Sequence, residues 1–223
     1  MKKNLLSLAF AATAMAASIY TTGCTQDTYQ QASAAKNEAQ NLQSKMQELS
    51  NQIAVTSESL STLVKNTETD PTDRYKAFVS ASDKFNSLDK SVENGVSSFL
   101  GSIQKNFDLR RASLSAIADS TLRKKTQSQL DSDTQKIKNV TDSFEEARQS
   151  LTAYQQNLTD ANNYLKASNL NPTGLKGAQG FAKSTASLGE DAIKELKDVI
   201  AVITKAAEAI APSDVQPVPT AAK

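Results

Sequence analysis

The stretch IKNVTDSFEEARQSLTAYQQNLTDANNYL, residues 137–165, decides the fold. Its apolar and small side chains recur at alternating steps of three and four residues. They are Ile137, Val140, Phe144, Ala147, Leu151, Tyr154, Leu158, Ala161 and Leu165. This heptad-like seam predicts an amphipathic α-helix whose narrow apolar face packs against other helices.

The same pattern runs through about residues 27–67, where Thr56 is its one polar member. The apolar and small positions there are Ala32, Ala35, Ala39, Leu42, Met46, Leu49, Ile53, Leu60 and Leu63. Residues 71–118 and 172–211 show a looser spacing of the same kind. Four long amphipathic helices are therefore expected.

Three short stretches separate these helices. Asp70-Pro71 and Asn171-Pro172 favour helix starts, because Asp and Asn cap helices and Pro is tolerated at the first helical position. No Gly or Pro marks the stretch Asp119-Ser120. We place a turn there with Ser120 as the cap, and one helix running straight through is the open alternative.

Glycines recur every three residues at the start of the fourth segment, at Gly174, Gly177 and Gly180. No strand precedes them and no Lys-Ser/Thr pair follows, so they do not match a phosphate-binding loop. We interpret them as sites of close helix contact or as a frayed helix start.

These features predict an all-α fold, an elongated up-down-up-down four-helix bundle or antiparallel coiled coil. The helices are expected at about 27–67, 71–118, 120–168 and 172–211. The composition agrees, with 39% hydrophobic and 22% charged residues and only 7 Gly and 5 Pro among 223 residues. Residues 24–211 would form one domain, and the Pro-rich residues 212–223 a disordered tail.

Residues 1–23 are typical of an export signal, with Lys2 and Lys3 ahead of an apolar stretch too short to span a membrane. The stretch ends in Tyr20-Thr21-Thr22-Gly23-Cys24, which resembles a bacterial lipobox. The resemblance implies that Cys24 becomes the first residue of the mature chain and carries acyl groups, palmitate among them. Acyl chains anchor a protein stably when several are present.

Thr25 follows the cysteine, so there is no Asp at that place. By the sorting rule of enteric bacteria, this implies an outer membrane lipoprotein, on the periplasmic side. Cleavage removes Lys2 and Lys3 and no acid, which leaves 23 basic and 24 acidic side chains and a formal net charge of −1. This near-neutral balance gives no reason to expect nucleic acid as a partner.

The C-terminal half resembles a family of proteobacterial coiled-coil lipoproteins that is defined as a domain of unknown function. The resemblance rests on four stretches: Ser120-Thr121-Leu122-Arg123-Lys124, Gln129-Leu130, Tyr164-Leu165-Lys166 and Asn169-Leu170-Asn171. Ala167-Ser168 stands where the family has a single His. Membership implies a helical lipoprotein and assigns no activity.

A basic cluster surrounds the predicted central turn, with a net charge of +4. It comprises Lys105, Arg110, Arg111, Arg123, Lys124 and Lys125, against Asp108 and Asp119. One interpretation is a solvated hairpin end kept soluble by its charge. The other is a surface that binds anionic lipid headgroups, because the second helix of an up-down bundle returns to the end that carries Cys24.

The chain has no His, no Trp and a single Cys. Those counts exclude most metal sites and the His-dependent catalytic triads, so we expect no enzyme activity, no cofactor and no metal. We predict a structural spacer or a protein/membrane interaction module, with an unidentified envelope protein as partner. The alternative is a membrane-active protein, pore-forming or membrane-remodelling, that uses the basic tip. Homo-oligomers through the narrow seams remain open.

Overall fold

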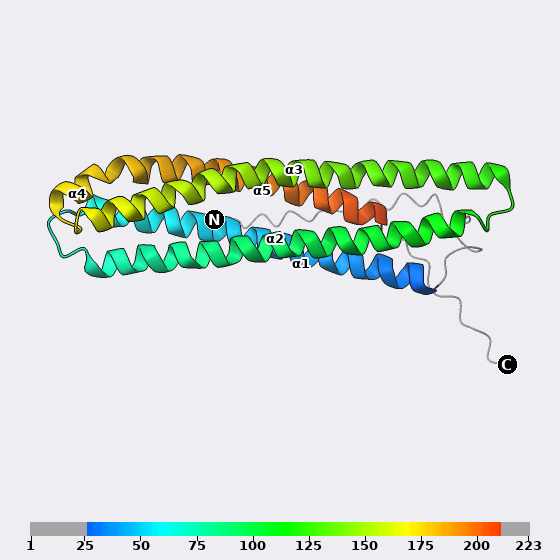
Figure 1. Cartoon of the computed structure of the whole chain (residues 1–223), viewed down its shortest axis with the longest axis horizontal. Helices are drawn as coiled ribbons and strands as arrows, with labels where there is room; N and C mark the ends of the chain where they lie inside the picture. The colour runs from blue at the N-terminus through cyan, green and yellow to red at the C-terminus, as the bar shows by residue number, and fades with distance from the viewer. Residues whose placement is uncertain (1–25, 211–223) are drawn as a thin grey trace, which may run out of the picture.

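The computed structural model describes residues 26–210 and shows an all-α bundle, as predicted. The described residues form five helices and no strand. The helices are α1 (Gln26–Lys65), α2 (Thr72–Leu114), α3 (Ser120–Ala167), α4 (Pro172–Gly177) and α5 (Gln179–Ile210). They alternate in direction along one long axis, and the short α4 turns the chain at one end (Figure 1). The predicted export signal, Cys24 and the tail at 212–223 lie outside the described residues.

The expected turn near Asp119 is present, so α2 and α3 are separate helices. Its details differ from the prediction, because α2 ends at Leu114 and the cap is Asp119 rather than Ser120. The Asp119 side chain accepts a hydrogen bond of 2.7 Å from the backbone N–H of Leu122. Asp119 has extended backbone geometry, as N-cap residues do, whereas Ser120 is already helical.

The turn at Asn171 follows the expected capping chemistry, whereas at the first turn Pro71 rather than Asp70 is the N-cap and α2 begins at Thr72. Asn171 accepts from the backbone N–H of Gly174 at 2.7 Å, and Pro172 is the first residue of α4. Asp70 accepts from the backbone N–H of Thr72 at 2.9 Å and from its hydroxyl at 2.6 Å. These bonds satisfy donors that a helix start leaves without an intrahelical partner.

The fourth predicted helix is interrupted at Ala178, so a single helix over 172–211 is wrong. Glycine weakens a helix by about 1 kcal/mol relative to alanine, and two glycines precede the break. Both let the backbone approach α3: a Cβ on Gly174 would overlap the Ser168 side chain, and one on Gly177 would overlap the Tyr164 hydroxyl. Gly180 has open space around it. Close contact therefore explains the first two glycines and not the third.

The heptad seams form the core. Every seam position predicted on the first helix is buried, Thr56 included. Among the described residues, all buried aromatic side chains lie on α2 and α3. They are Phe78, Phe85, Phe99, Phe107, Phe144 and Tyr154. The buried hydrophobic residues of α1 and α5 are Ala, Val, Leu, Ile and Met instead, which lets those two helices pack closely.

The four long helices pack as a ring in chain order. Helix α1 packs extensively on α2 and on α5, and α3 packs extensively on α5. The contact between α2 and α3 is much thinner. The side of the bundle between α2 and α3 is therefore the most loosely packed, and we call it the α2–α3 seam.

Candidate functional site

The basic cluster lies at the tip of the α2–α3 hairpin. Helix α1 begins and α5 ends at the same end of the bundle, and the hairpin tip projects beyond both (Figure 1). Cys24 precedes the start of α1 by two residues in the sequence. The fold thus brings the last turns of α2 and the first turns of α3 to the end from which the predicted anchor leaves.

The Arg110 side chain pairs with a buried carboxylate between α2 and α3 and does not point outward from the hairpin. Its guanidinium lies 2.9 Å from the carboxylate of Asp133, whose side chain is only 1% exposed. The side chains of Gln129, at 3.0 Å, and Lys136, at 3.4 Å, also bond this carboxylate. The Arg110 guanidinium also stacks over Phe107, 5.7 Å from the ring centre. Arg110 compensates a buried charge, a role that does not require a ligand.

Arg123 closes the turn. Its guanidinium donates two hydrogen bonds to the backbone carbonyl of Ile117, at 2.9 and 2.6 Å. The backbone N–H of Arg123 donates to the carbonyl of Asp119 at 3.0 Å. This side chain satisfies a carbonyl left open where α2 ends. It is solvent-exposed, but its hydrogen-bonding groups point into the turn.

The outward-facing charge comes from the other four basic residues. Lys105, Lys124 and Lys125 are exposed. Arg111 is half exposed and lies 3.6 Å from the carboxylate of Asp108. Ion pairs of this kind are held weakly and exchange with water. A cationic surface at the tip therefore consists of these four side chains, two from each helix.

The sequence pattern did not single out Asp133 as part of this cluster, although a signal was present. Asp133 falls between Leu130 and Ile137 at the three- and four-residue spacing of the α3 seam. A carboxylate at a seam position must be paired when it is buried. The partner, Arg110, is on the other helix, and only the fold identifies it.

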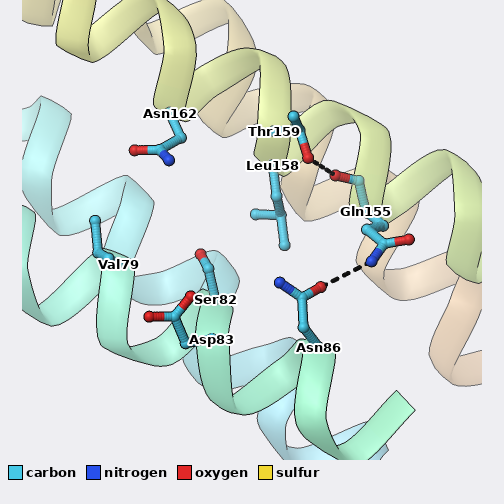
Figure 2. Close-up of a pocket in the computed structure, with 8 residues that line it drawn as sticks. All are labelled: Val79, Ser82, Asp83, Asn86, Gln155, Leu158, Thr159 and Asn162. Carbon is cyan, nitrogen blue, oxygen red and sulfur yellow. Dashed lines mark hydrogen bonds between the residues drawn. The ribbon is translucent and has the colours of Figure 1, made fainter. Parts of the chain in front are cut away.

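A second feature is a cavity of about 90 Å³ in the seam between α2 and α3 (Figure 2). Its lining is mostly polar: Val79, Ser82, Asp83, Asn86, Gln155, Leu158, Thr159 and Asn162. Gln155 donates to the side-chain carbonyl of Asn86 at 2.8 Å, and Tyr75 donates to that of Asn162 at 2.7 Å. The amide nitrogen of Asn86 points toward the cavity (Figure 2).

Closer to the tip, charged side chains lie along the contact between α2 and α3. Arg148 of α3 pairs with Glu93 of α2. Asp89 is one helical turn away, and its partial burial raises the pKa of its carboxyl while the charge of Arg148 opposes that rise. Among the described residues, no group of three His, Cys, Asp or Glu side chains is placed to hold a metal ion.

Tyr154 connects α3 to α1 across the bundle interior. Its hydroxyl donates to the carbonyl of Ile53 at 3.0 Å and lies 3.1 Å from the Ser57 hydroxyl. Burial raises the pKa of this phenol to about 12, so it stays neutral. Phe85 meets the ring edge-on with centres 5.0 Å apart, and Gly189 of α5 leaves the space that the ring fills.

Searches of protein-family models, curated proteins and solved structures gave no match to this chain. Within residues 26–210, no helix combines the length and apolar character needed to cross a bilayer.

Proposed function

We propose that this protein is a lipid-anchored component of the bacterial cell envelope that acts as a structural spacer or interaction module, without catalysis. One observation carries the proposal: a lipobox-like sequence ends at Cys24, and a long helical bundle begins two residues later. An acyl anchor there would hold the bundle by one end. Helix α3, with 48 residues, measures about 72 Å at 1.5 Å per residue, so the far end would stand well away from the membrane.

Two sequence features support a more specific placement. The residue after the cysteine is Thr25, which favours the outer membrane, and its periplasmic side is the location we propose. The resemblance to coiled-coil lipoproteins in the C-terminal half agrees with this placement. The long polar sides of the helices would then meet a protein partner of the envelope.

The anchor is tested by metabolic labelling with a palmitate analogue, wild type against Cys24→Ala, followed by membrane fractionation. The expected result is label on the wild type, none on the variant, and wild-type protein in the outer membrane fraction. An unlabelled wild type found in the soluble fraction would overturn the proposal.

We further propose that the hairpin tip contacts anionic lipid headgroups beside the anchor. Lys105, Arg111, Lys124 and Lys125 supply the charge, since Arg110 and Arg123 are engaged within the hairpin. Each cation near an anionic surface contributes about 1 kcal/mol. Acyl chains and cations together hold a protein at a membrane more firmly than either does alone.

The tip is tested with full-length, unacylated Cys24→Ala protein and vesicles of phosphatidylglycerol and phosphatidylcholine. Replacing the three exposed tip lysines by Gln (Lys105, Lys124 and Lys125) should weaken binding at least tenfold. The matched control replaces Lys166, Lys176 and Lys183, three exposed lysines at the opposite end of the bundle. Equal binding by both triple variants would refute the tip as the contact. Dye release from the same vesicles would instead favour the membrane-active alternative.

A further inference from the structure

The α2–α3 seam is the thinnest of the four contacts between the long helices. Besides the ring contact of Phe85 with Tyr154, three polar pairs bridge it away from the tip: Tyr75 with Asn162, Asn86 with Gln155, and Glu93 with Arg148. The cavity lies between the first two pairs. Polar pairs at a part-exposed surface exchange with water at small net cost, whereas interdigitated apolar side chains do not.

The flanking interfaces are joined at the level of the cavity by buried hydrogen bonds between α1 and α2 and by part-buried ones between α3 and α5. On α1, Gln52 and Thr56 both donate to the carbonyl of Ala81 on α2, at 3.0 and 3.1 Å. On α3, Asn157 donates to the Thr185 hydroxyl of α5 at 2.5 Å. Because Gln52, Thr56 and Thr185 are buried, breaking these bonds would leave buried polar atoms without a partner. Helix α2 is thus held to α1, and α3 to α5.

The two ends of the seam are unequal. At the tip, the chain itself joins α2 to α3, and Arg110 pairs with the buried Asp133. At the other end, α2 begins and α3 ends with no direct chain connection between them. The last cross-seam bond there is the one between Tyr75 and Asn162.

We propose that the bundle opens along the α2–α3 seam, from the end at Tyr75 and Asn162. The α1–α2 and α3–α5 pairs move as two units about the tightly packed α1–α5 contact. Tyr154 is the latch, because its hydroxyl is held by Ile53 and Ser57 of the other unit. Opening would bring the aromatic pair of Phe85 and Tyr154, buried in the closed bundle, to the surface. This inference does not depend on the lipid anchor.

The test uses distances between paired spin labels in the full chain. Cys24 is the only cysteine, so in a Cys24→Ala background two introduced cysteines are the only sites that a spin label modifies. Lys76→Cys with Asn163→Cys spans the free end of the seam. Gln104→Cys with Asn139→Cys spans the seam near Arg110 and Asp133, as the matched control. All four positions are exposed.

The expected result is a second, longer distance at the free end and a single distance at the tied end. Tyr154→Phe should increase the longer component about fivefold, since the lost hydrogen bond contributes about 1 kcal/mol. Ser44→Cys with Lys84→Cys, on α1 and α2, should keep one narrow distance in both backgrounds. Circular dichroism checks that each variant remains folded.

Two outcomes would overturn the proposal. One is a single distance distribution of equal width at both ends of the seam, both in the protein with Tyr154 and in the Tyr154→Phe variant. The other is equal broadening at both ends or within the α1–α2 pair, because that would indicate general loosening rather than a hinged seam.

Discussion

The guanidinium of Arg110 lies 2.9 Å from the carboxylate of Asp133, and this pair joins α2 to α3 just before the hairpin tip. Asp133 is almost completely buried, while Arg110 retains 18% of its side-chain exposure. The pair therefore fixes which turn of one helix faces which turn of the other. A cation that the sequence alone placed on the outer surface acts inside the hairpin.

Replacing Arg110 by Met should destabilise the protein by about 1–3 kcal/mol, because the buried Asp133 carboxylate would keep Lys136 as its cation and Gln129 as a donor but lose its closest cation. Denaturant unfolding measures the change. The double variant Arg110→Met/Asp133→Leu should recover most of the loss, since no buried charge remains. A double variant as unstable as the single one would mean that packing, not charge compensation, explains the effect.

Two glycines of α5 provide a matched pair. An added Cβ at Gly189 would lie 3.0 Å from Ile53 Cγ2 and from the Ser57 hydroxyl oxygen, and 3.2 Å from the Tyr154 ring. A Cβ at Gly180 would meet nothing within 4 Å. Alanine gains about 1 kcal/mol of helix propensity at either position, but overpacking costs about 1–3 kcal/mol at Gly189.

We therefore expect Gly180→Ala to raise the free energy of unfolding by about 0.5–1 kcal/mol and Gly189→Ala to lower it by about 1 kcal/mol. Thermal unfolding followed by circular dichroism compares the two. If both substitutions stabilise the protein, the space around the Tyr154 ring is looser than these distances indicate.

Periodicity predicted the bundle because it reports which face of each helix is buried. It located the α1 and α3 seams and placed three turns within a few residues. It could not predict the break at Ala178, which depends on how closely Gly177 approaches Tyr164. It also did not reveal the seam cavity, since Asn86 and Asn162 look like ordinary surface amides until two helices are placed side by side.

At the candidate site too, one part could be predicted from the sequence and another part could not. Charge along the sequence identified the basic tip, but not which cations remain on its surface. Arg110 and Arg123 differ from Lys124 and Lys125 through contacts made after folding: a buried carboxylate on α3 and a backbone carbonyl at the end of α2. Neither contact has a signature in residue spacing.

Asp89 is expected to weaken the fold at neutral pH. Partial burial raises the pKa of its carboxyl, so ionisation is less favourable in the folded state than in the unfolded state. The contribution of Asp89 to stability is therefore fully present below the pKa of its carboxyl in the unfolded chain, and it is lost as pH rises through the pKa in the folded state. Asp89→Asn should raise the free energy of unfolding slightly at pH 7 and leave it unchanged at pH 3. Denaturant unfolding at both pH values measures this, and a stabilisation of equal size at both would exclude ionisation as its cause.

Tyr154 should make the protein sensitive to alkaline pH. Burial raises the pKa of its phenol to about 12 from an unfolded value of 10.0. Between those values the unfolded chain loses the phenol proton and the folded chain keeps it, so stability falls as pH rises, by at most about 1.4 kcal/mol per pH unit. Below pH 10 this contribution is fully present.

Tyr154→Phe removes both this dependence and the hydrogen bond to Ile53, so two effects are expected. At pH 7 the variant should be less stable by about 1 kcal/mol. Between pH 10 and 12 its stability should fall less steeply than that of the wild type, so the two curves should approach each other and then cross before pH 12. Urea unfolding at intervals from pH 7 to 12 measures both. Tyr75→Phe is the comparison variant. Burial also raises the pKa of the Tyr75 phenol, but the Tyr75 hydroxyl bonds Asn162 in the α2–α3 seam. Parallel curves for wild type and Tyr154→Phe would show that the Tyr154 phenol ionises as easily in the fold as outside it.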